Sequence, residues 1–236
     1  MPKLSIIIPT LNEEKYLPNL LYSIKKQSFD DYEIIIADNN SKDKTISIAK
    51  KFRCKIVKGG FPSKARNSGA KYAKGYYLLF LDADVILPEN FLQQIIHEFE
   101  KNKLDIATTK IIPLSNKEID KVLHELSNIF IKTLQYIKPF CGGFCILTKN
   151  EMHKKINGFD ENLNNLCDDH DYAQRMAKIG KFRILNEPKL FISTRRLEKE
   201  GRAKLISKYS KSTFYNLIGK KYKNNNIEYE WGNYGN

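Results

Sequence analysis

Two aspartates, Asp82 and Asp84, follow directly on an apolar run at residues 76–81. Because the chain leaves the pleat where such a run ends, carboxylates at this spacing can both approach one hard cation. Mg²⁺ prefers one or two protein carboxylates and completes its octahedron with water and substrate phosphates. The pair therefore suits a divalent ion bound with a diphosphate. The alternative is a strand-end turn in which Asp84 caps the next helix or Asp82 accepts a backbone hydrogen bond.

Polar and charged side chains also stand after two other predicted strands and at the start of a predicted helix. "PTLNEE" begins at Pro9, and "ADNNSKDKT" carries Asp38, so an acid and several polar groups stand where a base and a ribose could be held. "SKARNSG" at residues 63–69 supplies Lys64 and Arg66 at a predicted helix N-terminus. Both the amides there and the two cations favour an anion.

Alternating strands and helices are predicted to position these groups. Short, nearly continuous apolar runs alternate with segments of helical periodicity, which predicts an α/β fold with a doubly wound, mostly parallel sheet covered on both faces. Ligands of such sheets bind outside the C-terminal ends of the strands. The predicted strands are residues 4–8, 32–37, 55–57, 76–81 and 105–108, and the predicted helices are residues 13–27, 41–52, 63–74 and 89–99.

The second half of the chain is predicted to be more helical. An amphipathic helix is expected at residues 117–137, another begins with acids at Asp168, and a final one covers residues 202–218. The final helix carries lysines on one side and apolar residues on the other. The apolar positions of the first of these helices are Ile119, Val122, Leu123, Leu126, Phe130, Leu134 and Ile137; those of the last are Leu205, Tyr209, Phe214 and Leu217.

Composition excludes several classes of protein. Hydrophobic residues make up 42% of the chain, which excludes a mainly disordered protein, and four cysteines are too few for a disulfide scaffold. With no apolar run long enough to span a bilayer and no leader-like start, we expect a cytoplasmic protein. The net charge is +13, and residues 195–223 contribute +8 of it. This charge indicates an anionic partner: nucleic acid, a phosphorylated substrate or an acidic membrane.

Four segments in this order resemble the signatures of family 2 inverting glycosyltransferases of the GT-A fold. They are "SIIIPTLNEE", "IIIADNNSKDKT", "ARNSGAKYAKGYYLLFLDADV" and "INGFDENL…CDDHDYAQRMAKIG". The resemblance covers about residues 3–180. It implies a GT-A domain at residues 1–200, with a nucleotide-binding half at about 1–110 and an acceptor half at about 111–200. A basic amphipathic helix and tail would follow at residues 201–236.

The resemblance also implies roles for individual residues. Asp38 would contact the nucleotide base, Asp82 would lie near the ribose, and Asp84 would bind Mg²⁺ or Mn²⁺. Asp169 would be the catalytic base beside Asp168, where the family usually has glutamate; the alternative is that these acids only favour a helix N-terminus. The remaining nucleotide contacts would come from Pro9, Thr10, Leu11, Glu13 and Arg66, joined by Lys64.

The implied reaction is a single displacement. An acceptor hydroxyl would attack the anomeric carbon of a UDP- or GDP-sugar while a carboxylate base takes its proton and a cation neutralises the diphosphate. Many relatives complete the metal site with a histidine, and none follows His170 here. Arg195 and Arg196 occupy about that place and could meet the diphosphate through their guanidinium groups, or be solvated surface charges.

Rival functions remain open from the residues alone. "LDADV" also fits the nucleophile motif of haloacid dehalogenase-type phosphatases, although there the motif normally lies on the first strand. A basic module that binds nucleic acid or membrane is the second alternative. We expect instead a transferase whose residues 201–236 contact a membrane and reach a lipid-linked glycan, with no nucleic-acid partner.

Overall fold

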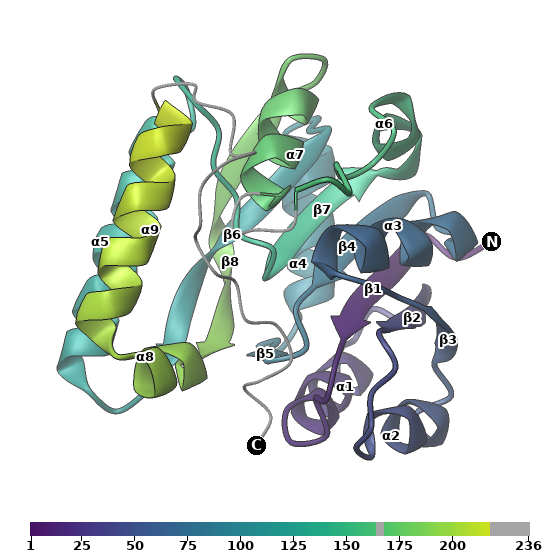
Figure 1. Ribbon diagram of the computed structural model, residues 1–236. Helices are drawn as coiled ribbons and strands as arrows, with labels where there is room; N and C mark the ends of the chain where they lie inside the picture. The colour runs from purple at the N-terminus through teal and green to yellow at the C-terminus, as the bar shows by residue number, and fades with distance from the viewer. Residues whose placement is uncertain (164–167, 218–236) are drawn as a thin grey trace.

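A computed structural model of the chain describes residues 1–163 and 168–217. Within these residues, one eight-stranded sheet carries helices on both faces, with α3 and α7 in front and α4 behind in Figure 1. The strand order is β3-β2-β1-β4-β7-β6-β8-β5. The predicted α/β fold class is confirmed. Cys167 and the predicted tail beyond residue 217 lie outside the described residues.

The first half of the chain forms a parallel half-sheet, as predicted. β1 pairs in parallel with β2 and β4, and β2 pairs in parallel with β3. Every residue of β1 and β4 is buried, as expected for strands covered on both faces. The elements are β1 (Leu4–Thr10), α1 (Leu17–Lys25), β2 (Tyr32–Asp38), α2 (Thr45–Lys51), β3 (Lys55–Lys58), α3 (Pro62–Tyr72) and β4 (Tyr77–Leu81).

The second half turns the sheet into a mixed one. β7 runs antiparallel to β4 and β6, β5 runs antiparallel to β8, and β6 and β8 are parallel. The sequence did not lead us to assign β5, β7 or β8. The elements are β5 (Val85–Ile86), α4 (Phe91–Lys101), β6 (Ile106–Leu114), α5 (Glu118–Leu134), β7 (Cys145–Lys149), α6 (Asn150–Lys155), α7 (Asp168–Ala177), β8 (Phe182–Ser193), α8 (Arg195–Glu200) and α9 (Arg202–Leu217).

The two faces of the sheet support two hydrophobic cores. Ile6 and Ile8 of β1 point into one core with α1 and α4, and Ile7 points into the other with α3 and α7. On the second face the helix comes very close to the strand, because a Cβ placed on Gly69 would lie 2.4 Å from Cγ2 of Ile7. This packing holds the C-terminal ends of β1, β2 and β4 in a fixed arrangement.

No helix in residues 1–163 and 168–217 is long and apolar enough to cross a bilayer.

A buried histidine in the second core gives a prediction about pH. Nδ1 of His153 lies 2.9 Å from the Tyr172 hydroxyl, among Phe80 and Phe159. Burial lowers the pKa of His153 to about 4. Between about pH 6.5 and pH 4 the unfolded chain therefore binds a proton on His153 that the folded chain does not bind. The free energy of unfolding keeps its full value above about pH 6.5 and decreases as the pH falls towards 4.

We expect the His153→Gln variant to lose less stability than the unsubstituted chain between pH 7 and pH 4.5. The difference should be about 2 kcal/mol, because only the unsubstituted chain must leave the imidazole uncharged. Urea denaturation at the two pH values measures it. Equal losses in both proteins would contradict a neutral, buried His153.

Candidate functional site

The carboxyl ends of β1 and β2 hold Asp38 firmly. Thr10 and Asp38 are register partners at the ends of the two strands. The Thr10 hydroxyl donates to Oδ1 of Asp38 at 2.9 Å, and the Ser41 amide donates to Oδ2 at 2.9 Å. Pro9 is buried in β1, and Leu11 is the first residue after that strand. The structure therefore brings the predicted nucleoside-binding residues together at one edge of the sheet.

Arg195 joins two of the predicted site acids. Its two terminal nitrogens donate to the Glu13 carboxylate, each at 2.8 Å, and its Nε donates to Oδ2 of Asp84 at 2.8 Å. The guanidinium lies 4.3 Å from the centre of the Tyr16 ring. β8 brings Arg195 to this place, because the Ser193 amide bonds to the Asp84 carbonyl at 3.1 Å.

Burial dominates the electrostatics of this triad. It raises the pKa of Glu13 to about 7, although the bonded Arg195 opposes the shift. Burial likewise raises the pKa of Asp84, again against the charge of Arg195. A buried acid pair keeps its charge only with a hydrogen-bonded cation. Arg195 therefore favours the charged forms of Glu13 and Asp84 against the effect of their burial.

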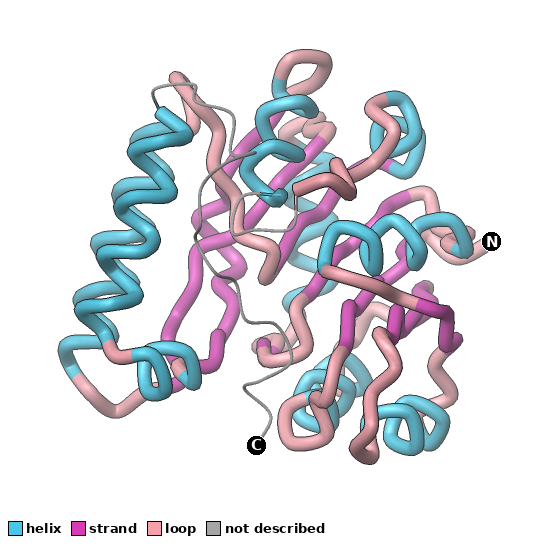
Figure 2. The backbone as a smooth tube through the Cα atoms, viewed as in Figure 1, coloured by secondary structure: helices cyan, strands magenta, loops and turns pink. Residues whose placement is uncertain are grey.

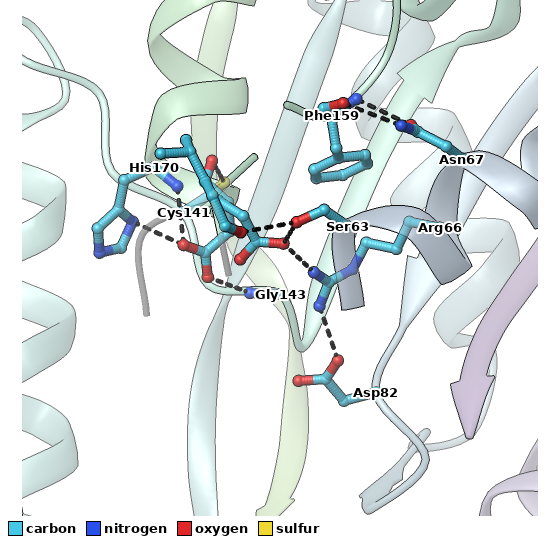
Figure 3. A network of polar contacts seen from close by, with 11 residues as sticks. Ser63, Arg66, Asn67, Asp82, Cys141, Gly143, Phe159 and His170 are labelled. Carbon is cyan, nitrogen blue, oxygen red and sulfur yellow. Dashed lines mark hydrogen bonds and ion pairs between the residues drawn. The ribbon is translucent and has the colours of Figure 1, made fainter. Parts of the chain in front are cut away.

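Arg66 forms a second arginine bridge, which joins Asp82 to Asp168 (Figure 3). Its side chain is 4% exposed, Nη2 lies 3.0 Å from Oδ1 of Asp82, and Nη1 lies 2.8 Å from Oδ2 of Asp168. The Ser63 hydroxyl also donates to Oδ2 of Asp168 at 3.0 Å, and the guanidinium lies 5.4 Å from the Phe159 ring centre. Burial raises the pKa of Asp168, which Arg66 opposes. α3 and the start of α7 are thus locked to the end of β4.

Asp169 is held by different partners from those of Asp168. The Gly143 amide donates to its Oδ2 at 2.7 Å, and the His170 amide donates to its Oδ1 at 2.8 Å. The Cys141 thiol donates to its backbone carbonyl at 3.0 Å. Neither carboxylate oxygen is paired with an arginine within the described part of the chain. Asp169 therefore remains the acid of this region that a substrate hydroxyl could approach as a base.

Gly143 is a site residue that we did not predict. It belongs to none of the motifs singled out in the sequence. A Cβ on Gly143 would lie 2.1 Å from Nη2 of Arg66, whose buried guanidinium is held in two ion pairs. Gly143 thus separates the base candidate Asp169 from the arginine bridge, and its lack of a side chain lets both approach.

The Gly143→Ala variant is expected to lose activity because the new methyl group must displace Arg66 or move the amide that holds Asp169. A misplacement of about 1 Å at a reacting group can cost on the order of 10²-fold in rate. Steady-state kinetics and a nucleotide titration would measure the loss. Unchanged kcat and nucleotide affinity would show that the close approach has no functional role.

Most of the predicted charged site residues belong to one of two ion-paired groups. Arg195, Glu13 and Asp84 form one group, and Asp82, Arg66 and Asp168 form a second, linked through the residue between the two aspartates. Arg196 is the second residue of α8, and its positive charge acts to lower the pKa of Asp84. Lys64 is exposed on α3 and forms no ion pair with either group in the described residues. Ser63 and Tyr16, which we did not predict, support the two bridges.

The aspartate pair fits a divalent cation that arrives with a diphosphate. No group of three or more His, Cys, Asp or Glu side chains in residues 1–163 and 168–217 could hold a metal by itself. Arg66 engages Oδ1 of Asp82 and Arg195 engages Oδ2 of Asp84, so one oxygen of each carboxylate is bonded to an arginine. Two carboxylates with phosphate oxygens and water satisfy Mg²⁺. The donor set thus fits a cation whose coordination the substrate completes.

Comparisons with known proteins agree with this geometry. The model of the family described as glycosyl transferase family 2 matches residues 5–157. Poly(ribitol-phosphate) β-N-acetylglucosaminyltransferase TarS of Staphylococcus aureus (strain Mu50) is 25% identical over 236 residues, which cover 92% of this chain and 39% of TarS. Minor teichoic acid biosynthesis protein GgaB of Bacillus subtilis is 35% identical over 141 residues, which cover 55% of this chain and 15% of GgaB.

Solved structures share the fold. The crystal structure of S. aureus TarS 1–349 in complex with UDP has a TM-score of 0.67 at 21% identity and covers 84% of this chain and 62% of that one. A mannosyltransferase from Pyrobaculum calidifontis in complex with GDP-Man and Mn²⁺ has a TM-score of 0.67 at 19% identity, with coverages of 80% and 56%. The chain spans about two fifths of the length of TarS.

Proposed function

The chain belongs to glycosyl transferase family 2, and we propose that it transfers a sugar from a UDP- or GDP-sugar to an acceptor hydroxyl with inversion at the anomeric carbon. One observation carries the proposal. Asp82 and Asp84 are bonded to Arg66 and Arg195 respectively at the C-terminal edge of the sheet, while Asp169 stands in a separate set of hydrogen bonds. In this proposal, one pair of carboxylates serves the donor and a separate carboxylate serves the acceptor. Family membership removes the support for a phosphatase.

The donor would bind along the strand ends. Asp38, with residues 9–13, would receive the base, and Asp82 would lie near the ribose. Arg66 and Lys64 of α3 would face the phosphates. In this proposal Arg195 neutralises Asp84 and Glu13 before the donor enters, and Arg196 adds positive charge beside the diphosphate.

The acceptor would be activated by Asp169. As the hydroxyl oxygen bonds to the anomeric carbon, its proton would pass to the Asp169 carboxylate and the nucleoside diphosphate would leave from the opposite face. A positioned base of this kind contributes roughly 10²- to 10⁴-fold in rate. A bound Mg²⁺ or Mn²⁺ would supply Lewis-acid neutralisation of the charge that grows on the diphosphate, and Asp84 and Asp82 would hold it.

The acceptor class follows from charge and from relatives. TarS is named for transfer to poly(ribitol-phosphate), which is a polyanion. This chain carries a net charge of +13, which would attract such a polymer from solution. We therefore propose an anionic polyol-phosphate chain as acceptor, lipid-linked as the sequence suggested. The predicted cytoplasmic location and the absence of a nucleic-acid partner remain part of the proposal.

A thermal-shift screen of UDP, GDP and their sugars with Mn²⁺ or Mg²⁺ tests the donor site. A ligand at 100 times its Kd stabilises the fold by about 2.7 kcal/mol, which corresponds to an upward Tm shift of roughly 5 to 10 °C for a chain of this size. Asp84→Asn should lose the metal-dependent part of the shift. The absence of stabilisation by any nucleotide, or a phosphorylated Asp82 after incubation with a phosphate ester, would overturn the proposal.

A further inference from the structure

The fully buried side chains of helix α5 are polar. Asp120 and Asn128 are its buried residues, and Gln135 at its C-terminal end is buried too. Asn128 accepts a hydrogen bond from the Ile111 amide at 3.1 Å and donates to the Ile111 carbonyl at 2.9 Å. Gln135 accepts one from the Ile184 amide at 3.0 Å. Polar side chains of α5 therefore satisfy backbone groups of β6 and β8.

The apolar side of α5 faces outwards as a consequence. Five large apolar side chains on this side are 45% to 58% exposed, and we call them the α5 stripe: Ile119, Val122, Leu126, Ile129 and Phe130. Their spacing of three and four residues places them on one helix face. Tyr136 and Ile137 extend the exposed apolar surface just beyond the helix. A contiguous apolar surface of this kind on a folded domain marks an interaction site.

Helix α9 carries positive charge and is joined to α5 through its first turn. Residues 202–217 include four basic side chains and no acidic one. Arg202 in the first turn of α9 donates to both oxygens of Asp120 in the first turn of α5, at 2.7 and 2.9 Å. Figure 1 and Figure 2 draw α9 in front of α5, and this ion pair joins the first turns of the two helices. Lys204 and Lys211 are exposed on α9, as are the apolar Ile206 and Tyr209.

We propose that the α5 stripe and the lysines of α9 form a docking surface for an anionic phospholipid bilayer. A helix lying in the membrane interface presents apolar side chains to the acyl boundary, and nearby lysines meet the anionic headgroups. Burial in a two-fold dimer is less favourable, because a self-complementary interface would bring the two copies of the lysine-rich α9 together. The sequence analysis expected the membrane contact in residues 201–236, whereas this proposal assigns the apolar part of the contact to α5.

Vesicle flotation of the full chain tests the surface with defined variants. Leu126→Ser/Ile129→Ser removes two stripe side chains that are more than half exposed, so the fold should persist. Tyr22→Ser/Tyr76→Ser is the matched control, since both tyrosines are exposed on other parts of the molecule. Lys204→Gln/Lys211→Gln lowers the charge of α9, and Lys50→Gln/Lys51→Gln makes the same change in net charge on α2.

We expect the unsubstituted chain to float with phosphatidylserine-containing vesicles and to bind pure phosphatidylcholine weakly. The stripe variant should bind at least tenfold less, and the α9 variant about fivefold less for each lysine removed. Both controls should bind as before, and UDP or GDP stabilisation should be equal in all five proteins. Equal flotation of the stripe variant, or none by the unsubstituted chain, would overturn the proposal. So would a concentration-dependent dimer that the stripe variant abolishes.

Discussion

Replacing Asp169 with asparagine is expected to lower kcat by roughly 10²- to 10⁴-fold, the range that a positioned general base contributes. The asparagine side-chain oxygen can still accept the hydrogen bond from the Gly143 amide, which the carboxylate accepts at 2.7 Å. The local geometry should therefore persist. What the amide cannot do is take a proton from the acceptor hydroxyl. The loss should thus fall on kcat, and nucleotide affinity should change little.

Sugar transfer and nucleotide binding should be measured separately for this variant. Asp171→Asn is the matched control, because Asp171 lies in the same first turn of α7 and pairs with Arg175 at 2.6 Å rather than with the site. The control should keep kcat within a few-fold, as expected for a partly exposed ion pair. An Asp169→Asn enzyme with near-normal kcat would remove Asp169 from the role of base.

The first half of the fold could be predicted because short stretches of its sequence are enough to identify each strand and helix. β1 and β4 are buried on both faces, so their sequences are continuous apolar runs that stand out from the helices between them. The acids at the ends of β2 and β4 then fall at one edge of a parallel sheet. The prediction that Asp38, Asp82 and Asp84 lie at this edge needed only this topology.

The second half could not be predicted in the same way. β8 carries Asn186, Glu187 and Pro188 in its middle, where its pairing with β6 also shifts register, so its sequence does not resemble one long strand. β5 contains two residues. For α5, helical spacing predicted an amphipathic helix correctly. Spacing alone does not tell which side chains become buried, and the fully buried ones here are polar.

The partners of the site acids also escaped prediction. Arg195 bonds to Glu13 across 182 positions of sequence, and Ser63 bonds to Asp168 across 105. Such pairs depend on how distant elements pack, and no short motif encodes them. The residue types could suggest charge near a diphosphate, whereas the two arginine bridges required the assembled sheet.

Replacing Arg66 with methionine is expected to destabilise the chain by about 3 to 5 kcal/mol, because removing one partner of a buried ion pair leaves an uncompensated charge. Asp168 would lose its bond to Arg66 at 2.8 Å and keep the one from the Ser63 hydroxyl, and Asp82 would lose its bond at 3.0 Å. Urea denaturation measures the change. Lys121→Met removes an exposed ion pair with Glu118 and should cost less than about 1 kcal/mol.

The double variant Arg66→Met/Asp168→Asn distinguishes an uncompensated charge from a simple loss of packing. Asparagine at 168 carries no charge and can still accept from Ser63, so the double variant should recover more than half of the stability lost by Arg66→Met. Burial already raises the pKa of Asp168, and without Arg66 the folded state should bind this proton more tightly still. The penalty of Arg66→Met should therefore be smaller at pH 5 than at pH 8. A penalty that neither low pH nor the second substitution relieves would mean that Arg66 acts through packing alone.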